Sequence, residues 1–556
     1  MVDLTSKLAY GIALVFGAVL CTLTYAAKYK HQDALNRSVV SVLMGALVGL
    51  TVRFVIAPAV GFDIAAWHTD MVSDDPNKTL QPVVFLFFYP YLFWPSGWFA
   101  RVDYLCYHVD WLVLMSLGPV VCTIATTALI RLGHLWWRSL FYSAEVLARY
   151  PLTLRDLYLS AACVSYPDPT PLLFAMGDLN VPAPVSVTVL WESLAAPNVA
   201  TFLVNRALRP KTEFSKMDFW TLVELLGPGD TIWKDIIPSI FSGIFIGFCL
   251  CALLRIRWLQ SRPSWEAIFV LISPFFVHSA VQSLGLWAIL ADMPCGVVMS
   301  VYGRHQISNE GLRLADSFVT QMTILICTLY YISVSAYFAV FSRGLGVIFG
   351  IWIFFCCIVG RIVTIATCLP TCAILRRTYS RWCTDSGAQS STECEISRMK
   401  LACLLFGGQT RGGVWFAWYF QQIEGYEKEM IIEAVLTTWL LSQITFGLFP
   451  RKIYLWSGLP YGSGSEAFNG DGCRYNPLWY EKVCFLRPAL WLHNKVLKKL
   501  FDLDYDHTHE LESFIEPSWQ PGNRWMGAAS VLPRRVSTIA EEARLSVEMG
   551  RRRSTH

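Results

Sequence analysis

Long apolar runs recur along the chain, and their length indicates the class of protein. Each of the longest runs extends for about twenty residues, the length of helix that crosses the hydrocarbon layer of a membrane. Only a helix satisfies its own backbone hydrogen bonds there, so each run predicts a membrane-spanning helix. The predicted spans are 8–27, 39–60, 111–130, 236–254, 267–291, 318–341, 346–370 and 430–449. The pattern therefore predicts an all-α integral membrane protein, a polytopic helical bundle of about eight to ten transmembrane helices.

An aromatic segment between the second and third of these spans departs from the pattern. Nine of the fifteen residues in 85–99 are aromatic, and Pro90 and Pro95 interrupt any helix there. Proline lacks an N–H donor and clashes with the preceding turn. A broken or re-entrant segment over 82–99 is therefore expected near the membrane surface. It could serve as an interfacial aromatic anchor or as an aromatic-lined mouth for a substrate.

A second irregular segment, 401–420, is apolar at both ends and glycine-rich in its centre. The central sequence is GGQTRGG, at 407–413. Two interpretations stay open. It forms either a discontinuous or re-entrant span, the kind of backbone that transporters place around a substrate, or a plain loop that joins two short helices.

These patterns divide the chain into four regions. Residues 1–130 hold the N-terminal spans, and 131–234 form a mixed amphipathic or soluble insert at the membrane interface, with a proline-rich middle. Residues 235–450 hold the main transmembrane bundle. Residues 451–556 form a polar C-terminal tail that is predicted to be disordered toward its end.

Composition supports the membrane class and excludes others. The chain is 54% hydrophobic and only 15% charged, against roughly a quarter charged residues in soluble domains. Its net charge of +4 is small, and no basic-aromatic patch indicates nucleic-acid binding. The partner that composition predicts is the lipid bilayer of a plasma membrane or endomembrane. The seventeen cysteines contain no CxxC pair, and paired histidines for a transmembrane haem are absent, so no cofactor is expected.

An acidic cluster in the tail, 502–510, is a candidate metal site. Its alternating carboxylates are similar to the start of a calcium loop, but His507 stands where such a loop needs glycine and Ser513 where it needs glutamate. The sequence therefore predicts a solvated turn and no metal site.

Ionisable residues deep inside spans are costly, so each is a candidate for function. Arg361 belongs to a helical face with Cys357, Thr364 and Cys368, spaced four, three and four residues apart, and this face is expected to point into the bundle. The acids recognised in the spans lie near their ends, so Arg361 and Arg53 are expected to lack a protein partner. An unpaired guanidinium suits a small anion, which it grips through paired hydrogen bonds. The alternative is that both arginines bind backbone carbonyls or reach toward the membrane surface.

His278 is the third candidate, with Gln282 one turn further along the same predicted helix. A histidine in this position could relay protons in a coupled transporter or act as a general base on a lipid-dissolved substrate. The alternative is a helix-packing role.

Sites of modification are predicted outside the spans. Asn77 lies in an Asn-Lys-Thr sequon within an acidic loop, which favours glycosylation. Ser537 and Ser554 follow arginine clusters, which favours phosphorylation of a cytosolic tail that binds a cytosolic partner.

Three functions are compatible with these patterns, and no motif identifies a family or indicates an enzyme more strongly than a transporter. The leading hypothesis is a multi-pass protein that transports or senses a small anionic solute through Arg361, His278, Arg53, Gln282 and Thr364. The second is a membrane-embedded lipid transferase or hydrolase that uses His278. The third is a membrane receptor or scaffold that acts through the insert and the tail.

Overall fold

The computed structural model consists of helices long enough to cross a membrane, as the apolar runs predict. It describes residues 14–25, 37–60, 81–99, 110–149, 151–168, 183–208, 232–260, 262–342, 344, 346–383, 410–412, 426–447 and 496–497. Within these ranges, seven helices are long and apolar enough to span a bilayer: Arg37–Ala59, Leu112–Ser139, Lys234–Leu254, Pro263–Ser283, Asn309–Val340, Val347–Cys372 and Met430–Gly447. A shorter apolar helix covers Leu14–Tyr25. The predicted all-α polytopic class is confirmed.

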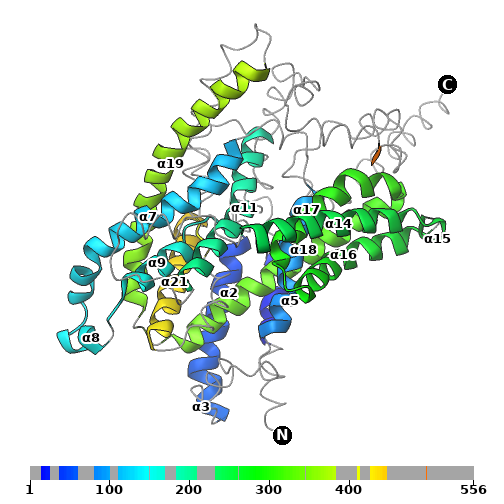
Figure 1. Ribbon diagram of the computed structural model, residues 1–556. Helices are drawn as coiled ribbons and strands as arrows, with labels where there is room; N and C mark the ends of the chain where they lie inside the picture. Colours follow the sequence, from blue (N-terminus) through cyan, green and yellow to red (C-terminus); the bar gives the residue numbers. More distant parts are fainter. Residues whose placement is uncertain are drawn as a thin grey trace, which may run out of the picture.

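The helices pack as two groups (Figure 1). The first, here called the α7 group, contains α7 (Asp110–Ser139), α9 (Leu154–Cys163), α11 (Ala183–Leu208), α19 (Val347–Cys383) and α21 (Tyr426–Gly447). The second, the α18 group, contains α2 (Arg37–Thr51), α5 (Gln81–Trp98), α14 (Ile237–Leu254), α16 (Pro263–Ser283), α17 (Ala288–Val298) and α18 (Asn309–Phe341). The two groups meet where α2 and α18 contact α21.

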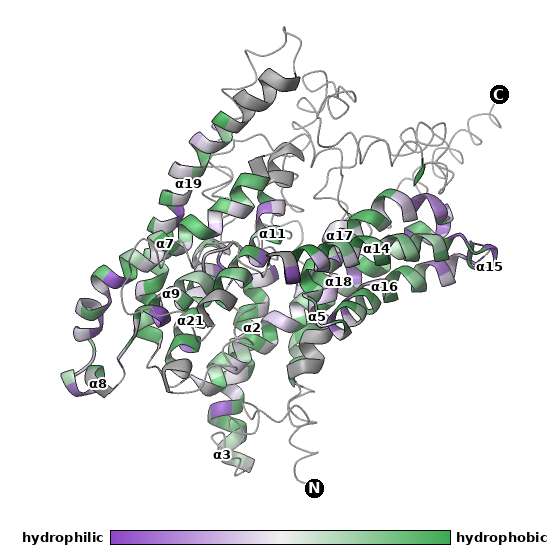
Figure 2. Ribbon diagram, viewed as in Figure 1, coloured by the Kyte–Doolittle hydropathy of each residue, from purple (hydrophilic) through white to green (hydrophobic). Residues whose placement is uncertain are grey.

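Short elements connect or extend the long helices. They are η1 (Val52–Ile56), α3 (Ala57–Val60), α8 (Ala144–Arg149), η2 (Ile232–Ile236), α15 (Arg257–Gln260), η3 (Met299–Gly303) and η4 (Arg304–Gln306). Figure 2 shows hydrophobic residues along most of the helices in both groups. Large apolar side chains such as Phe241, Phe245 and Phe276 point outward and are more than half exposed, as expected of surfaces that face lipid.

The aromatic segment forms one continuous helix, α5, with Pro90 and Pro95 inside it. The prediction of a broken segment at 82–99 is therefore corrected. Packing explains the difference. The aromatic side chains from Tyr89 to Phe99 are buried, with Trp94 and Trp98 fully enclosed, and α5 crosses α17 at a glycine on each helix. A methyl group at Gly97 would collide with the carbonyl oxygen of Met293, and one at Gly296 with that of Trp94, so the two backbones touch directly.

The predicted span 267–291 is divided into two helices. Helix α16 ends at Ser283, and Gly285 adopts a positive φ of 73°, a conformation that glycine tolerates without steric cost. The chain then reverses, and α17 packs back against α16 and α5. This turn brings residues near the end of the predicted span beside its middle.

The region predicted as an insert, 131–234, contributes two helices to the interior of the α7 group. Helix α9 is buried from Asp156 to Cys163, and its N-terminus is closed by a capping box between Thr153 and Asp156. Helix α11 buries Leu194, Ala196 and Ala200 completely. Glu192, Pro184 and Pro197 lower the apolar character of this stretch in the sequence, although the helix packs inside the bundle. The tail 451–556 lies outside the described residues apart from 496–497.

Candidate functional site

Two non-helical segments pair in the interior, where α9 has ended and before α21 begins. Residues 166–168 and 410–412, here called the extended pair, form an antiparallel bridge between Pro167 and Arg411. The amide of Asp168 donates to the carbonyl of Thr410 at 2.8 Å, and the amide of Gly412 donates to that of Tyr166 at 3.0 Å. In a membrane protein, backbone outside helices is tolerated only where protein buries it or where it lines a cavity.

Three residues of the glycine-rich segment, 410–412, are described, and they are non-helical; the rest of 401–420, on which the choice between a discontinuous span and a loop depends, lies outside the described residues. Thr410 and Arg411 are buried and bonded to the chain that follows α9, which a surface loop would not be. Transporters place irregular backbone of this kind at their binding sites.

Asp168 holds the extended pair to both helix groups. Its Oδ2 accepts hydrogen bonds from the Tyr331 hydroxyl at 2.6 Å, from Trp439 Nε1 at 3.3 Å and from Gln443 Nε2 at 3.1 Å. Tyr331 belongs to α18, whereas Trp439 and Gln443 belong to α21. Three donors to one oxygen compensate the charge of a carboxylate that is only 3% exposed.

Arg411 ties the extended pair to the rest of the α7 group. Its guanidinium donates to the carbonyl of Cys357 on α19 at 2.8 Å and to that of Ser165 at 3.3 Å. It also contacts the Cys122 thiol of α7 at 3.7 Å. Sequence reasoning did not single out Arg411. The signal that could have found it is a lone charge inside an apolar, glycine-rich segment.

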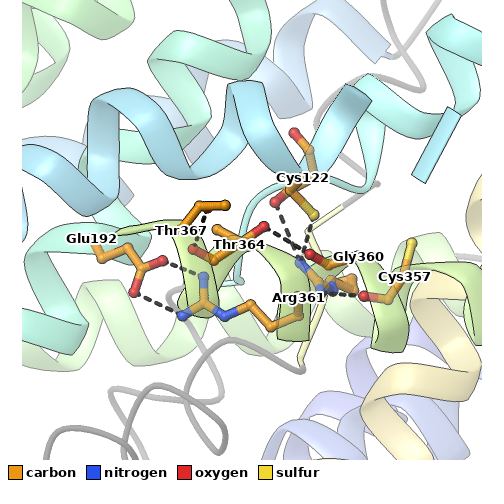
Figure 3. A network of polar contacts seen from close by, with 9 residues as sticks. Cys122, Glu192, Cys357, Gly360, Arg361, Thr364 and Thr367 are labelled. Atoms are coloured by element: carbon orange, nitrogen blue, oxygen red, sulfur yellow. Dashed lines mark hydrogen bonds and ion pairs between the residues drawn. The ribbon is translucent and has the colours of Figure 1, made fainter. Parts of the chain in front are cut away.

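Arg361 is paired with a carboxylate, so the prediction that it lacks a protein partner is wrong. Its two terminal nitrogens donate to the two oxygens of Glu192 on α11, one from Nη1 to Oε1 and one from Nη2 to Oε2 at 3.0 Å (Figure 3). Both side chains are at least 98% buried. Two parallel bonds between a guanidinium and a carboxylate form the strongest common ion-pair geometry.

The predicted inward face of α19 is confirmed by burial. Cys357, Arg361, Thr364 and Cys368 are all buried. Arg361 reaches Glu192 from this face (Figure 3). One turn earlier, the Cys357 carbonyl accepts a hydrogen bond from Arg411. The Thr364 hydroxyl donates to Gly360 within the same helix at 2.8 Å.

The remaining predicted residues lie elsewhere. Arg53 donates to the carbonyls of Ser342 at 2.9 Å and Ala339 at 3.3 Å, at the C-terminal end of α18, as the alternative interpretation expects. His278 Nδ1 bonds to Asp292 Oδ2 at 2.7 Å between α16 and α17. Gln282 is exposed. No described hydrogen bond or ion pair joins Arg361, His278 and Arg53 into one site. Asn77, Ser537 and Ser554 lie outside the described residues.

The buried arginines and carboxylates at the centre of the α7 group are neutralised by partners of opposite charge or by hydrogen bonds. The extended pair itself contains Asp168 and Arg411, and Glu192 and Arg361 form a buried ion pair in the same group. Within the described ranges, no group of three or more His, Cys, Asp or Glu side chains could hold a metal ion. Asp168 accepts from three donors, whereas Glu192 is neutralised by one side chain, that of Arg361.

Comparison with known proteins gives consistent results. Residues 14–450 match a family described as "Sodium/hydrogen exchanger, transmembrane". Sodium/hydrogen exchanger 8 of Gallus gallus is 23% identical over 333 residues, which are 60% of this chain and 54% of that protein. Sodium/hydrogen exchanger 3 of Didelphis virginiana is 23% identical over 312 residues, 54% of this chain and 33% of that protein. The chain thus spans about half or less of the length of these curated relatives.

A solved structure shares the arrangement of helices. The sodium proton antiporter MjNhaP1 of Methanocaldococcus jannaschii superposes with a TM-score of 0.50 at 14% sequence identity. The similarity covers 81% of this chain and 98% of that one. At this level of identity, the likeness is one of fold.

Proposed function

The chain belongs to the sodium/hydrogen exchanger family and is a multi-pass membrane transporter, and from this premise we propose that it exchanges an alkali-metal cation, Na⁺ in the first place, for protons. Glu192 is the residue that we assign to the exchanged ions. Arg361 is its counter-ion when neither ion is bound.

The buried pair of Glu192 and Arg361 carries this proposal. The case for an anionic solute depended on an unpaired guanidinium, and Glu192 occupies both of its terminal nitrogens. The Glu192 carboxylate can instead bind another positively charged species in place of Arg361. A proton and a small alkali cation both qualify, because carboxylate oxygen is a hard ligand.

Burial makes the two ions compete. A buried carboxylate that loses its partner is strongly destabilising, by about 3–5 kcal/mol in proteins. Glu192 therefore requires Arg361, a proton or a cation at every stage. Since one carboxylate holds one of these at a time, loading of the cation displaces the proton, and that displacement couples the two movements.

The surroundings of the pair support a binding region. Cys122 of α7 packs beside Gly360, the residue before Arg361 on α19, and its thiol contacts Arg411 of the extended pair. A Cβ placed on Gly118 of α7 would lie 3.9 Å from Glu192 Oε1 and 3.8 Å from the Thr364 methyl group, so α7 approaches the carboxylate without a side chain of its own. Through α7, the pair is therefore connected with the irregular backbone of the extended pair.

Reconstitution tests the proposal. Full-length protein in vesicles with an internal pH dye is given an inward Na⁺ gradient, and exchange raises the luminal pH. We expect Glu192→Gln to lower the rate at least about tenfold, because the neutral amide cannot attract a cation. Glu433→Gln is the matched control. Glu433 is buried on α21 and accepts from the Gly346 amide at 2.8 Å, which a glutamine oxygen can also do.

The outcome that would overturn the proposal is a wild-type Na⁺-driven rate in Glu192→Gln. Parallel gradients of Li⁺ and K⁺ identify the preferred cation. A chloride gradient tests the anion hypothesis directly, and flux that follows chloride instead of cations would favour it.

A further inference from the structure

The α18 group contains a second buried ionisable pair, which the proposed exchange reaction does not use. His278 of α16 and Asp292 of α17 are bonded through Nδ1 and Oδ2 at 2.7 Å. Their side chains are 6% and 0% exposed. The reversal at Gly285 brings them together, because it folds α17 back along α16.

The pair of His278 and Asp292 needs an added positive charge to be neutral. Asp292 Oδ1 is buried and has no hydrogen-bond partner among the described residues. If the imidazole is neutral, the pair carries one net negative charge inside a membrane protein, where uncompensated charge is costly. One proton on His278 gives an imidazolium–carboxylate pair and removes that net charge.

Other charged groups on the neighbouring helices do not balance the pair. The described residues of α5 and α14 include no Asp, Glu, Lys, Arg or His, and their titratable groups are the tyrosine hydroxyls of α5 and the thiols Cys249 and Cys251 of α14. Helix α17 contributes Asp292 and the Cys295 thiol. On α18, Asp316 pairs with Arg304 at 2.8 Å, and Glu310 and Arg313 are exposed. On α16 itself, Glu266 accepts from the amide and the hydroxyl of Ser308.

Tyr89 of α5 connects this pair with the extended pair. Its ring stacks on the His278 imidazole, with centroids 6.3 Å apart and planes inclined by 16°. Tyr89 also belongs to the same buried cluster as Tyr166 and Tyr330. Tyr166 is a member of the extended pair and precedes Asp168 by two residues.

We propose that His278 and Asp292 form a proton-binding site distinct from Glu192, and that its occupancy changes the exchange rate through Tyr89, which stacks on His278 and belongs to the same buried cluster as Tyr166 of the extended pair. The effect on rate rests on the proposed function, whereas proton binding at this site does not. The ligand of this site is a proton, and protonation of the His278–Asp292 pair sets the pH range in which the transporter works.

Infrared difference spectroscopy tests proton binding without transport. Spectra of the purified full chain at acidic and alkaline pH record which imidazole and carboxylate groups change protonation. We expect bands in the wild-type difference spectrum that are absent in His278→Gln and altered in Asp292→Asn. His305→Gln, at an exposed histidine of η4 in the same helix group, is the control and should retain them. Identical spectra for the wild type and His278→Gln would overturn the site.

The pH profile of exchange in vesicles tests the effect on rate. We expect the pH of half-maximal exchange to shift by about one unit in His278→Gln and in Asp292→Asn, since either change removes the paired proton site. Tyr89→Leu should shift the profile but keep the infrared bands, because it removes the contact and leaves the pair.

Each failure has its own signature. Unchanged pH profiles in both pair variants would overturn the regulatory role even if the infrared bands are present. Absence of cation-driven exchange in the wild type would contradict the proposed function, and the infrared comparison would still decide whether the pair binds a proton.

Discussion

Arg361 and Glu192 lie 169 residues apart in the sequence and join through two parallel hydrogen bonds in the interior of the α7 group. The pair joins α19 to α11, two helices that are far apart in the sequence. Because each charge is enclosed, each depends on the other, and this dependence can be measured.

The first prediction concerns the stability of that pair. Arg361→Met should lower the free energy of unfolding by about 3–5 kcal/mol, because it leaves the Glu192 carboxylate buried without its counter-ion. The double variant Arg361→Met/Glu192→Gln should recover most of the loss, since the remaining amide is neutral. Denaturant unfolding in detergent measures both. Losses that simply add in the double variant would contradict the pairing.

The second prediction separates Arg53 from transport. Arg53→Gln should destabilise the protein by about 1–2 kcal/mol, because charged-group hydrogen bonds to the carbonyls of Ser342 and Ala339 are lost. Cation exchange in vesicles should continue at nearly the wild-type rate. Arg257→Gln, at an exposed arginine of α15, is the control and should change neither quantity. If folded Arg53→Gln protein has no exchange activity, Arg53 takes part in transport, as the sequence prediction had it.

The third prediction concerns the crossing of α5 and α17. Gly97→Ala and Gly296→Ala should each cost about 1–3 kcal/mol of unfolding free energy, because the added methyl group meets a backbone carbonyl that cannot rotate away. Gly17→Ala is the matched control, since nothing lies within 4 Å of the new methyl group there. Thermal unfolding in detergent compares the three. Equal midpoints would mean that the two helices do not touch at these glycines.

The sequence predicted the class of the fold because that depends on local properties. Apolar runs of spanning length predict helices whatever their neighbours are, and the spacing of Cys357, Arg361, Thr364 and Cys368 defines one face of α19 without knowledge of what it meets. All four residues are buried in the structure.

The partners of the charged residues could not be predicted in the same way. Glu192 lies in a stretch diluted by Pro184 and Pro197, which was interpreted as part of an interfacial insert. Its contact with Arg361 joins two helices that are distant in the sequence, and the spacing of polar and apolar residues within one helix does not predict which distant helix it contacts. Asp292 was missed because 267–291 was interpreted as one span. The glycine at 285 was the available sign of a turn.

The Asp168 carboxylate receives Tyr331 from α18 on one side and Trp439 and Gln443 from α21 on the other. If one helix group slides or tilts against the other, the three donors cannot all keep their distances to a single oxygen. One helix group therefore either rotates about an axis that passes near Asp168, or the 2.6 Å hydrogen bond from Tyr331 to Asp168 breaks. The residue that secures the irregular backbone therefore also limits the paths along which the two halves of the protein can move.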